Sequence, residues 1–92
     1  MIKGFKHKGL EKFFTTGSKS GIQSKYANKI RIILGRLNVA ICPKDVDLPG
    51  LRLHELTGNR QGTSAVKVDG NWRITFIFEG DDINIVDCED YH

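Results

Sequence analysis

The segment Asn71–Phe78, which reads N-W-R-I-T-F-I-F, is the clearest strand in the sequence. Side chains of a β-strand point alternately to its two faces, so this segment predicts a strand with two different faces. One face is apolar and has to be buried: Trp72, Ile74, Phe76 and Phe78. Arg73, Thr75 and Ile77 fall on the other face. Arg73 and Thr75 place a cation beside a hydroxyl there, which suits the placement of an anionic substrate on a rigid element.

Two helices are predicted in the first half of the chain. Apolar residues have helical spacing within Lys8–Thr16, and Gly17 follows where a left-handed C-cap would end that helix. A second helix of roughly 18 residues is expected to begin near Ser20–Gln23, whose S-x-x-Q pattern has the form of a capping box. Its apolar residues step by three and four positions and predict a buried stripe: Ile22, Tyr26, Ile30, Ile33, Leu34, Leu37 and Ile41.

The second half of the chain reads as strands separated by turns. Pro43 and Pro49-Gly50 bracket a loop, and Asp69-Gly70 is a dipeptide that suits a tight hairpin leading into the strand at Asn71–Phe78. Cys88–His92 is expected to be a polar terminal tail. Further strands are expected at Met1–Phe5, Leu51–Leu56, Ala65–Val68 and Ile83–Asp87. In the strand Leu51–Leu56, Arg52 and His54 would share one face.

These elements predict one α+β domain over residues 1–92, with the order β-α-α-β-β-β-β. Two N-terminal helices would pack on one face of a twisted, mainly antiparallel sheet of four to five strands. At 92 residues and 39% apolar content, the chain has material for one modest core and no second domain. The opposite face of the sheet would then be free to present polar side chains.

No apolar run approaches the roughly 18–20 residues that a membrane-spanning helix needs, and the first residues lack the apolar region of a secretory signal. A cytoplasmic protein without a membrane partner is therefore expected. Cys42 and Cys88 are expected to be reduced and packed as small apolar residues.

Charge is divided unevenly along the chain. Residues 1–44 contain ten Lys and Arg against one acid, which gives +9, and residues 45–92 contain four against ten, which gives −6. A basic half is typical of a protein that binds a polyanion, although a solvated lysine-rich surface explains it equally well. Lys25, Lys29 and Arg36 lie away from the apolar stripe, so their charges are expected on the outer faces of the helices.

The histidines and cysteines have no paired spacing typical of a zinc site, and no glycine-rich phosphate loop is present, so neither a metal nor a cofactor is expected. The remaining reactive side chains are His54, Arg73, Asp90, Tyr91 and His92. Such a set suits metal-independent RNA cleavage, which needs a base, an acid and a cation at the phosphate. The same residues could also be a surface histidine, an arginine paired with Asp87 or Glu89, and a frayed terminus.

The chain resembles, from end to end, the HigB family of bacterial toxins within the RelE/ParE superfamily. Four segments carry the resemblance: M-I-K-G-F-K-H-K-G-L at 1–10, L-R-L-H-E-L-T-G-N-R-Q-G at 51–62, N-W-R-I-T-F at 71–76 and D-Y-H at 90–92. The resemblance implies a RelE-like α+β fold and a ribosome-dependent endoribonuclease that cuts messenger RNA in the decoding site. It also implies a HigA-type helix-turn-helix antitoxin that silences the toxin and binds their shared operator DNA.

The resemblance also implies positions for the site. The functional histidine of the family falls on His54, and its C-terminal cluster falls on Asp90, Tyr91 and His92, with Arg73 in the matching strand. Several relatives carry a lysine where this chain has Thr57, so Arg52, Arg60 or Arg73 is expected to supply the positive charge instead. Contacts to RNA and the ribosome are predicted for Lys6, Lys8, Lys25, Lys29, Arg36, Arg52 and Arg60.

Two alternatives stay open from the sequence. ParE-like relatives share the fold and poison DNA gyrase without cutting RNA, and a fold alone does not separate these activities. A non-enzymatic RNA-binding or regulatory domain would bind RNA in a strongly salt-dependent way without cleaving it. His54 and the D-Y-H ending favour the ribonuclease.

Overall fold

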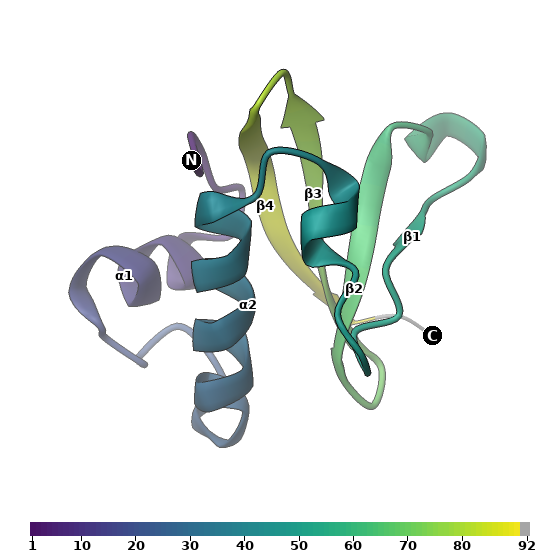
Figure 1. Cartoon of the computed structure of the whole chain (residues 1–92). Coiled ribbons are helices and arrows are strands. Elements are labelled where there is room, and N and C mark those ends of the chain that lie inside the picture. Colours follow the sequence, from purple (N-terminus) through teal and green to yellow (C-terminus); the bar gives the residue numbers. More distant parts are fainter. Residues whose placement is uncertain (91–92) are drawn as a thin grey trace.

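Two helices precede an antiparallel sheet in the computed structural model, which describes residues 1–90 (Figure 1). The helices are α1 (Lys8–Thr16) and α2 (Ala27–Val39), and the strands are β1 (His54–Glu55), β2 (Thr63–Asp69), β3 (Trp72–Glu79) and β4 (Asp82–Asp90). Three 3₁₀ turns connect them: η1 (Ser24–Tyr26), η2 (Pro43–Val46) and η3 (Gly58–Arg60). No helix in this part of the chain is long and apolar enough to cross a membrane.

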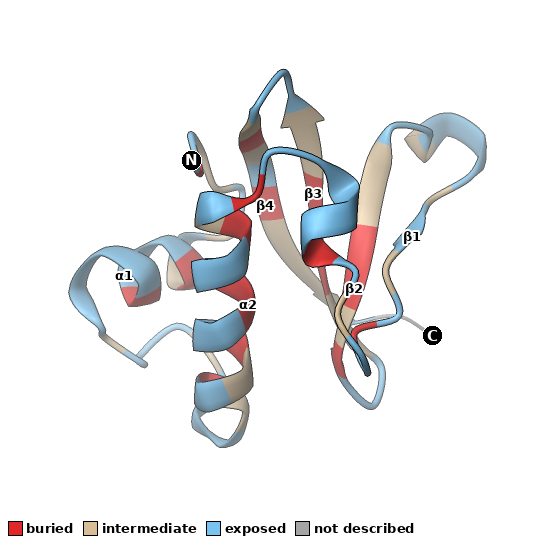
Figure 2. Ribbon diagram, in the orientation of Figure 1, coloured by how far each residue is buried: buried red, intermediate tan, exposed pale blue. Residues whose placement is uncertain are grey.

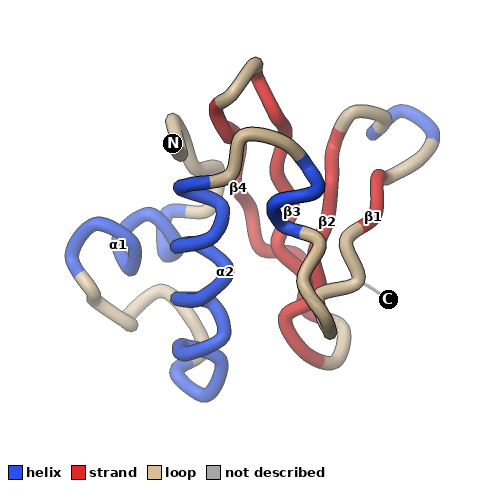
Figure 3. Tube along the Cα trace, viewed as in Figure 1, coloured by secondary structure: helices blue, strands red, loops and turns tan. Residues whose placement is uncertain are grey.

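The sheet has the order β1-β2-β3-β4, and every neighbouring pair is antiparallel (Figure 3). Both helices lie on the same side of the sheet, and their buried residues join those of the central strands in one core (Figure 2). The predicted α+β architecture of two N-terminal helices on a four-stranded sheet is therefore confirmed. The face of the sheet away from the helices is left for polar side chains.

The two-faced character of β3 is confirmed. Ile74 and Phe76 are fully buried in the core, and Trp72 and Phe78 pack against its edges. Burying each large apolar side chain contributes about 1.5–3 kcal/mol, so this face holds the helices to the sheet. Arg73 alternates with these residues and therefore lies on the other face.

The start of α1 and its end at Gly17 follow the prediction. Gly17 has a φ of 80°, and its amide donates to the Phe13 carbonyl at 2.9 Å, which is the expected left-handed C-cap. The start predicted for the second helix is wrong, because α2 begins only at Ala27, after η1, and no side chain caps it. Gly21 instead lies so close to Gly9 that a Cβ on Gly9 would be 2.1 Å from the Gly21 carbonyl oxygen. This backbone contact holds the predicted capping segment outside the helix.

The end of α2 also differs from the prediction. The helix stops at Val39, and Ala40 takes an extended conformation and enters the core. Ile41, which was predicted to belong to the buried stripe, is 62% exposed.

The predicted strand Leu51–Leu56 is mostly wrong, because β1 contains only His54 and Glu55. Arg52 has a φ of 51°, in the left-handed region that a β-strand does not use. Leu51 is buried just before it, and its carbonyl accepts from the Lys67 amide at 2.6 Å. The chain therefore turns at Arg52 before it can pair as a strand.

The predicted polar tail at Cys88–His92 is wrong for its first three residues, which continue β4 to Asp90. A bulge lies earlier in this strand, where the register with β3 shifts between Thr75 and Ile77 and Ile85 has a φ of 54°. The bulge leaves Ile85 half exposed and shifts the register, so that Asp87 and Glu89 lie opposite Thr75 and Arg73. Tyr91 and His92 lie outside the described residues.

The N-terminal segment runs along the outer edge of β4 and pairs with it through two isolated parallel bridges, Ile2 with Ile83 and Phe5 with Val86. Lys3 and Lys6 donate backbone hydrogen bonds of 2.7 and 2.8 Å to the carbonyls of β4. The predicted short strand at Met1–Phe5 does not form as a continuous strand, and only these two bridges are present. This contact covers an edge that would otherwise offer unpaired backbone groups.

Candidate active site

A groove of about 550 Å³ lies beside β1 and the hairpin that joins β2 to β3. All four Lys and Arg residues of the acidic half of the chain line it: Arg52, Arg60, Lys67 and Arg73. His54, Glu55, Leu56, Thr57, Gly70, Asn71 and Trp72 complete the lining. Four cations around one groove create a local positive potential that favours a polyanionic ligand.

The strand registers place the main groove residues in two adjacent rows on one face of the sheet. His54 lies opposite Ala65, and Ala65 lies opposite Thr75, so these three residues form one row. Lys67, Arg73 and Glu89 form the next row. With standard strand spacings, the Cα atoms of His54 and Arg73 are roughly 12 Å apart, so both side chains can reach one phosphodiester between them.

Two small side chains lie on the same face of the sheet beside the groove. Ala65 and Thr75 are both buried, and they occupy the row between His54 and the edge of β4. Larger residues at these positions would fill the space between the histidine and the cations. The sheet therefore supplies a rigid surface beside the groove over which long charged side chains can converge.

His54 is exposed, and its ring is held by the backbone. Its Nδ1 atom lies 2.9 Å from the Arg52 carbonyl oxygen. A carbonyl only accepts hydrogen bonds, so Nδ1 carries the proton and Nε2 of the neutral ring is left as an acceptor.

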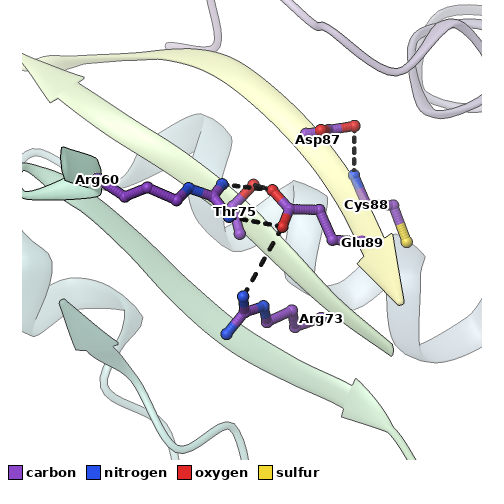
Figure 4. A network of polar contacts seen from close by, with 6 residues as sticks. All are labelled: Arg60, Arg73, Thr75, Asp87, Cys88 and Glu89. Carbon is purple, nitrogen blue, oxygen red and sulfur yellow. Dashed lines mark hydrogen bonds and ion pairs between the residues drawn. The ribbon is translucent and has the colours of Figure 1, made fainter. Parts of the chain in front are cut away.

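Glu89 lies at the centre of a charged network on the same face (Figure 4). Arg60 donates from Nη1 to Oε1 at 2.8 Å and from Nη2 to Oε2 at 2.5 Å, and the Thr75 hydroxyl donates to Oε2 at 3.1 Å. Arg73 approaches from the other side, with Nη2 3.8 Å from Oε1. The hydrogen bonds from Arg60 are the main reason that the pKa of Glu89 falls to about 2, and the same contact raises the pKa of Arg60.

Residues 3–92 match the family of HigB-like toxins, described as RelE-like toxins of the type II toxin-antitoxin system HigB. The chain belongs to this family. It is also 39% identical over 92 residues to "Endoribonuclease HigB" of Proteus vulgaris, and the alignment covers 100% of both chains. Membership of a type II system implies that this HigB-like toxin has a cognate antitoxin.

The toxin brings four of the predicted site residues together in the groove: Arg52, His54, Arg60 and Arg73. Asp90 is placed at the end of β4, opposite Trp72, which lines the groove. The predicted roles of Tyr91 and His92 fall on residues outside the described range. The groove therefore contains the histidine and the cations, and the C-terminal strand leads toward it.

The predicted cations of the first half lie elsewhere in the toxin. They belong to the N-terminal segment at the edge of β4, to η1 and to the two helices: Lys6, Lys8, Lys25, Lys29 and Arg36. The ammonium group of Lys25, for example, lies 5.1 Å from the ring centroid of its neighbour Tyr26. These residues do not line the groove.

Sequence reasoning missed two residues of this face, Lys67 and Glu89. The sequence predicts Lys67 only as part of a short strand and Glu89 only as an alternative partner of Arg73. The alternation Val66-Lys67-Val68 was a usable signal, since it places Lys67 on the face opposite the core. Glu89 had no such signal, because its position depends on the bulge in β4.

Neither cysteine forms a disulfide bond within residues 1–90. Burial raises the pKa of the Cys88 thiol to about 11, so it is a poor nucleophile at neutral pH. No group of three or more histidine, cysteine or acidic residues in the described part of the toxin could hold a metal ion. The groove offers a histidine, four cations and the Glu55 carboxylate, and Glu89 lies beside it through its contacts with Arg60 and Arg73.

Proposed function

We propose that this toxin is a ribosome-dependent endoribonuclease that cleaves messenger RNA in the decoding site and so stops translation. The observation that carries the proposal is the convergence of His54 and four cations on one groove. A histidine with an available ring nitrogen can move a proton at neutral pH, and the cations can hold a phosphodiester. The relationship to an endoribonuclease over the full chain supports the same activity.

In the proposed mechanism, Nε2 of His54 removes the proton from the ribose 2′-hydroxyl. The 2′-oxygen then attacks the phosphorus, and the bond from phosphorus to the 5′-oxygen breaks. The leaving oxygen takes a proton from a general acid, which we assign to the C-terminal cluster of Asp90, Tyr91 and His92. The products are a 2′,3′-cyclic phosphate and a 5′-hydroxyl end, and no metal ion or cofactor takes part.

The cations have a separate task in this mechanism. Negative charge grows on the phosphate oxygens as the phosphorane forms, and guanidinium groups fixed in the groove stabilise that charge. Arg73 is the best placed of them, because its side chain is only 14% exposed and extends from the rigid strand β3. Arg52, Arg60 and Lys67 complete the clamp.

The ribosome and the antitoxin are the proposed partners. The lysines and arginines of the N-terminal segment and helices would contact ribosomal RNA, while the groove receives the message. The antitoxin is proposed to be a HigA-type helix-turn-helix protein, through which the complex binds operator DNA. The proposed location is the cytoplasm, where translating ribosomes are found.

Primer extension on ribosomes loaded with a defined message tests the activity directly. The wild-type toxin should produce new 5′ ends in the decoding site, and His54→Ala should produce almost none. A DNA gyrase supercoiling assay runs in parallel for the ParE-like alternative. Inhibited supercoiling with an intact message would overturn the ribonuclease proposal, as would salt-dependent RNA binding without any cleavage.

A further inference from the structure

We propose that Glu89 is a positioning residue for RNA cleavage, because it holds Arg60 across the open face of the sheet and so shapes the groove. The inference rests on the ribonuclease function proposed above and concerns the same groove. It assigns a role to an acid that lies beside a groove proposed to bind a polyanion. The proposed role of Glu89 is to hold the arginines in position, although its own negative charge repels a polyanion.

The contact between Arg60 and Glu89 joins distant parts of the fold. Arg60 ends η3, in the loop between β1 and β2, and Glu89 lies on β4, at the opposite edge of the sheet. The Arg60 side chain must therefore cross the face of β2 and β3 to reach the carboxylate, and it passes Thr75 on the way (Figure 4). The loop between β1 and β2, which carries Arg60, therefore forms one side of the groove.

The other hydrogen bonds of this loop are local. Leu56 and Thr63 are joined by a backbone bond of 2.8 Å, and the Gly62 amide lies 3.4 Å from the Glu55 carboxylate. These bonds connect residues seven positions apart, whereas Arg60 and Glu89 are 29 positions apart. A bidentate guanidinium–carboxylate pair has a defined geometry, so it fixes the position of the loop as well as that of the charge.

The same carboxylate also keeps two guanidinium groups close together. Arg60 and Arg73 would repel each other in the empty groove, and Glu89 lies between them. The Arg60 side chain is still 41% exposed, which leaves part of it accessible to a phosphate. The two guanidinium groups are thus held in place before the substrate binds. Binding therefore has to immobilise fewer side chains.

A direct catalytic role does not fit Glu89. Its carboxylate is ionised far below neutral pH, so it is a weak base and has no proton to donate. It already accepts hydrogen bonds from Arg60 and Thr75. Its effect on the reaction therefore passes through the arginines.

The test compares single-turnover cleavage of ribosome-bound message by the wild type, Glu89→Gln, Arg60→Gln and the double variant. Misplacing a substrate-binding group by about 1 Å can cost up to about a hundredfold in rate, so we expect Glu89→Gln to lower kcat about tenfold. KM should change by less than about threefold, since Glu89 does not line the groove and all four cations that line it stay in place. The double variant should be no slower than Arg60→Gln alone, because both changes remove the same contact.

Two further variants separate position from charge. Glu89→Asp keeps the negative charge but shortens the side chain by one methylene, so it should lower kcat in the same direction, and it also covers the case in which Glu89→Gln fails to fold. Glu79→Gln is the matched control, because Glu79 bonds to Asn84 outside the groove, at 3.0 Å, and should leave cleavage unchanged. Thermal unfolding of each variant confirms that a folded protein was assayed.

The outcomes distinguish this inference from the function on which it rests. If the wild-type toxin does not cut the message, the ribonuclease proposal fails, and the role of Glu89 fails with it. If the wild type cuts but Glu89→Gln and Glu89→Asp retain its kcat, the positioning role alone is overturned. The same conclusion follows if the effects of Glu89→Gln and Arg60→Gln are additive.

Discussion

The helical half and the sheet half of this toxin use positive charge in opposite ways. Residues 1–44 carry ten Lys and Arg with a net charge of +9, and their cations are spread over the N-terminal segment, the helices and their connections. Residues 45–92 have a net charge of −6 and only four such residues, and all four line one groove. The acidic half therefore contains the stronger local site for an anion.

The difference follows from how charge acts over distance. Ions in solution screen exposed charges beyond about 8–10 Å, so cations spread over helices act nearly independently of one another. Cations around one groove lie close enough together for their charges to add at a ligand bound there. The net charge of a segment indicates general attraction to a polyanion, whereas the meeting of side chains in space defines a site. The five predictions below test this contrast, from the largest expected effect to the smallest.

His54→Ala should give the largest loss, because it removes the proposed proton acceptor in the groove. General acid–base groups are worth about 10²–10⁴-fold in rate, so roughly 3–5 kcal/mol of transition-state stabilisation should be lost. Single-turnover cleavage of ribosome-bound message measures the effect. Cleavage at the wild-type rate would remove His54 from the mechanism and, with it, the groove as the active site.

Removal of Tyr91 and His92 should relieve growth inhibition, because the proposed general acid belongs to the C-terminal cluster. The loss should approach that of His54→Ala, within the same range of about 10²–10⁴-fold. Growth after induction and the circular dichroism of the purified variant are the measurements. A truncated protein that is folded and fully toxic would place the acid elsewhere.

Arg73→Gln should lower cleavage by about 10–100-fold, or roughly 1.5–3 kcal/mol, since a charge-assisted contact to the developing phosphorane is lost. Lys25→Gln is the matched change in the helical half and should alter cleavage by less than about threefold. Comparing the two under identical salt conditions sharpens the contrast between the halves. Equal losses would mean that position in the groove gives a cation no advantage.

The ion pair of Glu89 should make the sheet half sensitive to acid. The pKa of Glu89 is lowered to about 2 in the folded protein, so its contribution is fully present above its ordinary pKa. The contribution is lost as the pH falls from about 5 toward 2. The unfolding free energies of the wild type and Glu89→Gln should differ by about 1–2 kcal/mol at pH 6 and converge near pH 2.

Urea unfolding at a series of pH values measures this difference. Glu79→Gln provides the control, because no comparable convergence is expected for an exposed carboxylate that bonds to an amide. A constant difference between wild type and Glu89→Gln down to pH 2 would show that the ion pair contributes nothing to stability.

The combined variant Lys25→Gln, Lys29→Gln and Arg36→Gln should have the smallest effect. It should weaken association with the ribosome mainly at low salt and flatten the salt dependence, because each lost phosphate contact reduces the number of released counterions. Cleavage of message at saturating ribosome concentration should stay within about threefold of wild type. A loss as large as that of Arg73→Gln would place part of the chemistry on the helical side.

Several features of this fold could be predicted from the sequence because they depend on neighbouring residues. The period of two in β3 determines that Ile74 and Phe76 share the buried face, and helical spacing with Gly17 determines α1. Arg73 could be assigned to the polar face for the same reason. These features repeat within a few residues, so a linear pattern contains them.

Only the tertiary structure decided how the site is assembled. The bulge near Ile85 shifts the register of β4 against β3, and the shifted pairing places Glu89 opposite Arg73. The contact from Arg60 to Glu89 then holds the loop between β1 and β2 over the sheet. Lys67 becomes part of the site because it lies opposite Arg73 in the sheet. Each of these steps depends on residues that are far apart in the chain and meet only when the sheet is complete, so no local pattern in the sequence could contain them.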